Sequence, residues 1–166
     1  MKSLYLTIDD LISIRYWVSE MLKYRTRSAE KRVKRAVKSL QLPYKLLGSG
    51  KSRIVYDLLN GYVLKIPITK DGLQCNQMEY DIYAHCSSKL RKYLCPVMEH
   101  GDGWIIMKKM IQRVNLTEDD EDKLLKMKKR FSQEQVLIFS LKAKNLRLYK
   151  DRIIIIDYGN FQLKQK

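Results

Sequence analysis

The sequence is poor in the residues that hold disulfide-rich and zinc-binding domains together. Its 166 residues include three cysteines and two histidines. The cysteines are odd in number and form no C-x-x-C pair, which argues against a disulfide framework and indicates a reducing, intracellular compartment. Their spacing relative to the histidines matches no common zinc pattern, so we interpret them as structural residues. The five residues are Cys75, Cys86, Cys95, His85 and His100.

Long apolar runs are also absent. No run approaches the roughly 20 residues that a helix needs to cross a bilayer, and the N-terminus lacks the apolar segment of a signal peptide. There is no internal repeat and no low-complexity linker. We therefore expect a cytoplasmic protein without a membrane partner, whose 45% apolar content builds one core in one or two lobes.

Acidic residues are scarce, with 18 Asp and Glu against 33 Lys and Arg and a formal charge of +15. Such a charge attracts nucleic acid, nucleotides, acidic proteins or membrane surfaces, and charge alone does not choose among them. A predicted helix over residues 28–40 has an apolar stripe and a basic opposite face, with Glu30 as its only acid. That face is either solvated or binds nucleic acid or another partner. The lack of interleaved aromatic residues favours the solvated face.

Hydrophobic periodicity predicts both helices and strands. Helices are expected over residues 7–23, with Thr7 as N-cap, and over 28–40, 71–92 and 117–139. The dipeptide Asn60-Gly61 predicts a tight hairpin in which both residues take positive φ. Strands are expected over residues 44–47, 53–59, 62–66, 94–100, 103–108, 146–149 and 152–156.

The segment Gly48-Ser49-Gly50-Lys51-Ser52 contains the end of a P-loop but lacks the first glycine, whose place is taken by Lys45. A P-loop opens a helix whose N-terminal amides face the phosphates. Here a β-branched segment and a hairpin follow, so a strand is predicted instead. We therefore do not expect Lys51 to be a phosphate-binding lysine.

The same segment resembles another phosphate-binding loop. Gly48 to Val55 is similar to the G-x-G-x-x-G-x-V loop of protein kinases, with Arg53 in place of the third glycine. Val63-Leu64-Lys65-Ile66 resembles the V-A-I-K strand of that family. The resemblance implies that Gly48, Gly50 and Val55 cover a nucleotide and that Lys65 pairs with its α- and β-phosphates.

Further residues follow from the same resemblance. Glu79, on the helix after the third strand, would orient Lys65 through an ion pair. Lys108 to Met110 would form the hinge along which adenine lies. The implied cofactors are ATP and Mg²⁺.

Two motifs near the C-terminus complete the set. Ser140-Leu141-Lys142-Ala143-Lys144-Asn145-Leu146 is similar to the kinase catalytic loop D-L-K-x-x-N-L, and Asp157-Tyr158-Gly159 resembles D-F-G. The resemblance implies that Asn145 and Asp157 bind Mg²⁺ through oxygen atoms. Lys142 would stabilise the γ-phosphate, and Ser140 stands at the position of the catalytic aspartate.

Five motifs in the family's order, across residues 47–159, indicate a compact protein-kinase-like protein of the small bacterial or bacteriophage type. The implied fold class is α+β, with a five-stranded antiparallel N-lobe sheet, one helix, a minimal C-lobe and extra N-terminal helices. We expect a basic helical extension over residues 1–43, a kinase-like N-lobe over 44–110 and a truncated C-lobe over 111–166. Taken singly, each motif also has a structural explanation, such as a surface lysine at Lys65.

Ser140 and the short C-lobe leave three functions open. The first is a minimal serine/threonine-type phosphotransferase, although a neutral serine cannot take a proton from the acceptor and Asp151 is the nearest alternative carboxylate. The second is a pseudokinase, a binding or regulatory module for a protein partner, with or without nucleotide. The third is a nucleic-acid-binding protein that uses the helix over residues 28–40.

Overall fold

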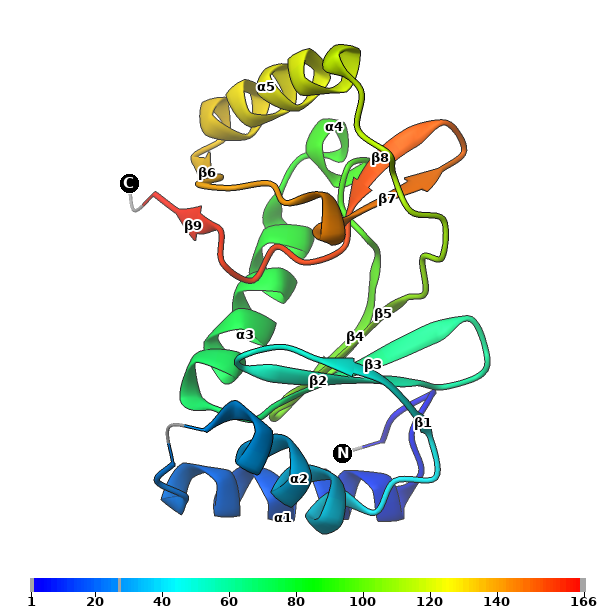
Figure 1. Ribbon diagram of the computed structural model, residues 1–166, viewed down its shortest axis with the longest axis vertical. Helices are drawn as coiled ribbons and strands as arrows, with labels where there is room; N and C mark the ends of the chain where they lie inside the picture. Colours follow the sequence, from blue (N-terminus) through cyan, green and yellow to red (C-terminus); the bar gives the residue numbers. More distant parts are fainter. Residues whose placement is uncertain (1, 27, 165–166) are drawn as a thin grey trace. The chain divides into compact units, whose positions relative to one another are not determined.

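The computed structural model describes residues 2–26 and 28–164, which form two compact units (Figure 1). Unit 1 contains the chain up to Asn76 together with Val97–Lys109. Unit 2 contains Gln77–Pro96 together with the chain from Met110 onwards. Within the described residues, no helix has the length and apolar character of a membrane span. The three-part division at residues 43/44 and 110/111 stays a prediction.

Unit 1 is built on a five-stranded antiparallel sheet. Its strand order is β1-β2-β3-β5-β4, and helix α3 (Lys70–His85) follows β3. This arrangement confirms the predicted α+β fold, with one helix after the third strand. The strands are β1 (Lys45–Ser49), β2 (Arg53–Asp57), β3 (Tyr62–Pro67), β4 (Val97–Gly101) and β5 (Trp104–Lys108).

The β2–β3 hairpin forms where Asn60-Gly61 predicts it, but with a different conformation. Positive φ occurs at Leu59 (60°) and Gly61 (89°) rather than at Asn60. The N–H of Leu58 donates to the carbonyl of Tyr62 at 3.1 Å, so the connection has three residues instead of two. A three-residue hairpin places a glycine at its last, left-handed position, which is why Gly61 suits this turn.

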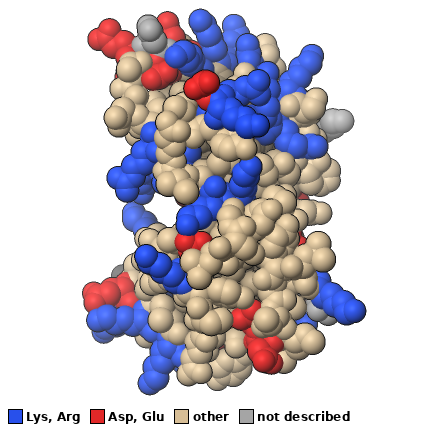
Figure 2. Space-filling model, turned by 90° about the vertical axis from the view of Figure 1, so that its right-hand side faces the viewer, with Lys and Arg blue, Asp and Glu red and all other residues tan. Residues whose placement is uncertain are grey.

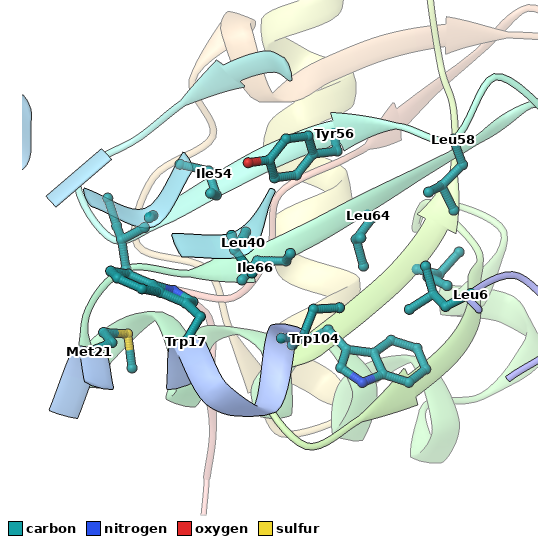
Figure 3. Close-up of a cluster of buried hydrophobic side chains, with 14 residues drawn as sticks. Leu6, Trp17, Met21, Leu40, Ile54, Tyr56, Leu58, Leu64, Ile66 and Trp104 are labelled. Atoms are coloured by element: carbon teal, nitrogen blue, oxygen red, sulfur yellow. The ribbon is translucent and has the colours of Figure 1, made fainter. Parts of the chain in front are cut away.

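Helices α1 (Ile8–Lys23) and α2 (Ala29–Leu40) cover one face of this sheet (Figure 1). A capping box between Thr7 and Asp10 begins α1, and the side chain of Ser28 caps α2. Their apolar stripes pack on the sheet in the core cluster shown in Figure 3. The cluster includes Ile14, Trp17 and Met21 of α1, Ala36 and Leu40 of α2, and Ile54, Tyr56, Leu64 and Ile66 of the sheet.

Unit 2 combines the later part of α3 with two helices and four short strands. Strand β7 pairs with β8 and strand β6 with β9, both antiparallel. Phe161 packs between Phe131 and Tyr158, with both ring-centroid distances at 6.2 Å. The elements are α4 (Ser88–Arg91), α5 (Glu118–Gln133), β6 (Val136–Leu137), the 3₁₀ turn η1 (Ala143–Asn145), β7 (Leu146–Tyr149), β8 (Arg152–Ile155) and β9 (Gln162–Leu163).

Two predicted helices were too long. The helix expected over residues 71–92 is divided, because Ser87 caps the new helix α4 and also bonds Glu134 through its hydroxyl at 2.6 Å. The helix expected over residues 117–139 ends at Gln133. Gln135 then takes a positive φ of 65°, and Val136 pairs with Leu163 of β9. In both cases a tertiary contact overrides a local helical pattern.

Candidate functional site

The glycine segment forms a tight turn between two antiparallel strands. The N–H of Gly50 donates to the carbonyl of Arg53 at 2.8 Å, and Gly48 lies opposite Val55 in the β1–β2 ladder. Strand β2, and not a helix, follows Lys51. The predicted exclusion of a P-loop is therefore confirmed.

Neither glycine of this turn is required by the folded chain itself. Gly48 and Gly50 have no positive φ. A Cβ at Gly48 would meet nothing within 4 Å, and one at Gly50 would only touch the carbonyl of Arg53 at 3.9 Å. Gly72 is the opposite case, since its Cβ would lie 2.2 Å from the carbonyl oxygen of Ser52. At Gly48 and Gly50, in the exposed strand β1 and the turn that follows it, no side chain covers the backbone.

Lys65 lies on the sheet face opposite the helices. It pairs with Val55 of β2 and Ile105 of β5, and cross-strand partners share a face. Its neighbours along the chain, Leu64 and Ile66, belong to the core cluster on the other face. The face that carries Lys65 also carries the apolar side chains of Val55, Val63, Ile105 and Met107, together with Arg53 and Asp57 at the two ends of β2.

Asn76 supports this face from helix α3. Its side-chain N–H donates to the carbonyl of Lys65 at 3.3 Å, and its oxygen accepts from Nη1 of Arg53 at 3.1 Å. Arg53 and Asn76 are both buried. The arginine that replaces the third glycine therefore ties the glycine turn to α3, a role that the sequence analysis missed.

The middle residue of the predicted hinge, Lys109, is anchored to unit 1. Nζ of Lys109 lies 2.5 Å from Oδ2 of Asp57, and the Lys109 N–H donates to the carbonyl of Gly61 at 2.9 Å. These bonds fix the end of β5 to the β2–β3 hairpin. Lys108 belongs to unit 1 and Met110 to unit 2, so the adenine contact assigned to both stays a prediction.

Glu79 is fully buried in unit 2 and bonds the D-F-G-like segment. Its Oε1 accepts the backbone N–H of Tyr158 at 3.0 Å. The Tyr158 hydroxyl donates to the carbonyl of Cys95 at 2.9 Å, and burial, followed by the charge of Glu79, raises the pKa of Tyr158 well above its usual value. The ion pair of Glu79 with Lys65 stays a prediction.

The β7–β8 hairpin brings the two predicted metal ligands close together. Leu146 pairs with Ile155 at its base, and the N–H of Ile156 donates to the carbonyl of Asn145 at 2.9 Å. Asn145 therefore lies beside the residue that precedes Asp157. The described residues contain no group of three His, Cys, Asp or Glu side chains suited to a metal. An amide and a carboxylate suit Mg²⁺ shared with phosphates.

The catalytic-loop-like segment lies just before this hairpin. Ser140 and Lys142 are exposed, and the carbonyl of Lys142 accepts the N–H of Asn145 at 2.8 Å. Asp151 is at the opposite end of the hairpin, in the turn between Tyr149 and Arg152. At about 3.4 Å per residue, three ladder positions separate the two ends by roughly 10 Å. Asp151 therefore lies at the end of the hairpin away from Asn145.

The basic face of α2 is partly neutralised within unit 1. Lys34 pairs with Glu30 at 2.8 Å. Arg35 lies 3.9 Å from Glu20 and 4.1 Å above the ring of Tyr24. Binding of nucleic acid by this helix stays a prediction.

Several residues of the sheet face were missed. Val63 and Met107 follow from strand alternation once the β3–β5 register is known, so the alternating pattern was the available signal. Gly72 and Asn76 carried no local signal, because their partners lie elsewhere in the sequence.

The chain is similar in structure, but not in sequence, to known proteins. No family model matches the sequence, and none of the curated proteins matches it. The structure of WbdD with the kinase inhibitor LY294002 is similar at a TM-score of 0.58 and 15% identity, over 74% of this chain and 34% of that one. A second WbdD structure is similar at a TM-score of 0.55 and 14% identity, over 75% of this chain and 34% of that one. This chain thus spans about a third of the WbdD chain.

A shorter protein is covered more fully. The streptomycin–ATP–APH(2″)-IIa ternary complex is similar at a TM-score of 0.50 and 15% identity, over 85% of this chain and 75% of that one. Identities this low report on fold alone. The described strands and helices follow the same architecture, and the chain has a protein-kinase-like fold.

Proposed function

We propose that the protein binds ATP with Mg²⁺ and is a kinase-like phosphotransferase. The observation that carries this proposal concerns the sheet face opposite the helices. Lys65 lies there between Val55 and Ile105, and the nearby turn contains two glycines that the folded chain itself does not require. An apolar face suits a purine, and a lysine with open backbone amides suits phosphates. APH(2″)-IIa, which shares the fold, is in complex with ATP.

In unit 1, Gly48 and Gly50 would approach the phosphates through their backbone, and Lys65 would pair with the α- and β-phosphates. Val55 would pack against the base, and Lys108 would contact its edge, a contact to which Met110 of unit 2 would also contribute. In unit 2, Asn145 and Asp157 would hold Mg²⁺. Bound Mg²⁺ neutralises charge on the phosphate oxygens.

The transfer step has a specific weakness. Ser140 cannot accept a proton at neutral pH, and Asp151 lies at the far end of the hairpin. Lys142 would stabilise charge on the transferred group. Because phosphoryl transfer depends mainly on positioning and electrostatics, we expect slow transfer to a hydroxyl of the serine or threonine type.

The location of Asp151 also favours a second candidate. A pseudokinase would keep the nucleotide-binding residues, lack the transfer step and act through a protein partner. The two candidates share ATP binding and differ only in turnover, so two successive experiments separate them.

The first experiment measures thermal unfolding with and without ATP and Mg²⁺. A ligand at 100 times its Kd adds about 2.7 kcal/mol of stability, so the wild-type midpoint should rise. Lys65→Met keeps the apolar stem but removes the charge and should abolish the rise. Lys51→Ala removes the exposed lysine of the P-loop-like sequence and should leave it intact. The proposal is overturned if ATP and Mg²⁺ do not raise the unfolding midpoint of the wild type, or if only Lys51→Ala loses this rise.

The second experiment follows radiolabelled phosphate from ATP. The phosphotransferase predicts slow labelling that is lost in Asp157→Ala and enhanced in Ser140→Asp, which restores a carboxylate. If ATP binds but no label is transferred by either the wild type or Ser140→Asp, the pseudokinase is the correct function.

A further inference from the structure

One face of the β7–β8 hairpin in unit 2 carries a row of arginines. Arg147 of β7 pairs with Ile154 of β8 and, through an isolated antiparallel bridge, with Arg113. Tyr149, two residues further along β7, pairs with Arg152. Residues two apart in a strand and cross-strand partners share a face. Arg113, Arg147, Tyr149 and Arg152 therefore lie on one surface, which we call the arginine face.

Three arginines of this face differ in how far they are exposed to solvent. Arg113 and Arg152 are exposed, and Arg147 is half-buried. No ion pair joins these arginines to a carboxylate among the residues that the structure describes. The only acid between residues 139 and 156 is Asp151. Figure 2 shows Lys and Arg side chains gathered over unit 2.

Arg147 is held in place despite its like-charged neighbour. Its Nη1 donates to the carbonyls of Lys144 and Leu146 at 2.9 and 2.7 Å. Burial and the charge of Arg113 lower the pKa of Arg147, although arginine stays charged at neutral pH. Two arginines kept adjacent, with no carboxylate partner among the residues that the structure describes, favour an anionic ligand.

An aromatic ring lies among these cations. Tyr149 is 37% exposed, and Nζ of Lys150 lies 5.7 Å from its ring centroid. Proteins that bind single-stranded nucleic acid combine cations for the phosphates with aromatic rings on which bases stack. On helix α2, in contrast, Lys34 and Arg35 already have acidic neighbours, and the ring of Tyr24 is covered by Arg35.

We infer that the arginine face binds single-stranded nucleic acid, with its three arginines on phosphates and Tyr149 stacked on a base. The positions of Arg147 and Tyr149 are about 7 Å apart along the strand. Charges spread over several positions suit a chain of phosphates better than one small anion. This function goes beyond ATP binding and does not depend on it.

The test is fluorescence anisotropy with a labelled oligouridine of about 12 nucleotides, within the site sizes of such proteins, and without ATP. The wild type should bind at low salt and weaken steeply as salt rises. Arg113→Gln/Arg152→Gln should bind at least tenfold more weakly, with a log–log salt slope shallower by about 1.4. Tyr149→Ala should weaken binding about tenfold with the slope unchanged.

Lys31→Gln/Lys38→Gln is the matched control, because it removes two exposed charges from α2. It should change affinity less than twofold. The inference would be overturned if both double variants lost the same affinity for oligouridine, or if the wild type did not bind it at low salt. It would also be overturned if poly-glutamate competed for the protein as well as unlabelled oligouridine does. Thermal unfolding checks that each variant is folded, and Arg113→Lys/Arg152→Lys should retain most of the salt dependence.

Discussion

The carboxylate of Glu79 accepts a hydrogen bond from the backbone N–H of Tyr158 at 3.0 Å, across 79 residues of sequence. Both residues are fully buried. The bond fixes the residue that follows Asp157, the predicted metal ligand. The glutamate singled out as the orienting partner of a lysine thus also positions the segment that carries Asp157.

This bond predicts a difference between two substitutions of Glu79. Glu79→Ala leaves the buried N–H of Tyr158 without its acceptor, which costs about 1–3 kcal/mol. Glu79→Gln keeps a carbonyl oxygen there and should retain most of the stability. Hydrogen exchange at the Tyr158 amide measures the bond directly. Protection should fall in the alanine variant and persist in the glutamine variant, and equal protection in both would contradict this role.

The glycines of unit 1 should respond in opposite ways to an added side chain. Gly48→Val adds a β-branched residue to an exposed strand with no atom within 4 Å of the new Cβ, so thermal stability should be unchanged and the ATP-dependent shift lost. Gly72→Ala should be destabilised because its Cβ meets the Ser52 carbonyl at 2.2 Å. Thermal unfolding with and without ATP distinguishes the two effects. Undiminished ATP binding by Gly48→Val would remove Gly48 from the proposed nucleotide site.

The Asp57–Lys109 pair should make unit 1 sensitive to acid. Hydrogen bonds from Nζ of Lys109 and then from the N–H of Leu59 lower the pKa of Asp57. Because the folded pKa is below the unfolded one, this stabilisation is complete above the ordinary Asp value of about 3.9 and is lost as pH falls through the folded pKa.

Unfolding temperatures measured from about pH 7 to about pH 2 test this pair. Asp57→Asn should unfold earlier than the wild type at neutral pH, and the difference should shrink in acid. Asp102→Asn, in an exposed turn, should follow the wild-type curve. A constant difference between Asp57→Asn and the wild type across the range would contradict the expected linkage.

Short sequence patterns predicted those features of the sheet that depend on residues close together in the chain. The dipeptide Asn60-Gly61 predicted the hairpin between β2 and β3, and the order of motifs placed Lys65 after the glycine turn and Asn145 before Asp157. Patterns within a segment do not identify its partner. The bonds of Asn76 join Arg53 and Lys65, which are 23 and 11 residues away, so its position had no local signature.

The same limit explains the errors and omissions in the helices. An apolar stripe on α1 shows that one side is buried but not that the sheet covers it. Val136 and Leu137 continue a plausible helical pattern, and only their pairing with β9 makes them a strand. Trp17, in contrast, reports directly on the packing of α1 against the sheet.

Trp17 joins α1 to the end of β3, where its indole N–H donates to the carbonyl of Pro67 at 2.8 Å. Trp17→Ala should cost about 3–5 kcal/mol. Trp17→Phe, which keeps most of the apolar contact but removes the donor, should cost about 1–3 kcal/mol. Tyr16→Ala, at a 59% exposed position on the same helix, should stay within about 0.5 kcal/mol of wild type.

Urea unfolding followed by the fluorescence of Trp104, which belongs to the same core cluster, measures these differences. If Trp17→Ala greatly lowers the free energy of unfolding and Tyr16→Ala leaves it unchanged, α1 is a structural layer of unit 1. If Trp17→Ala unfolded at the wild-type urea concentration, the sheet would be stable without this layer, and α1 would be an appendage available for another role.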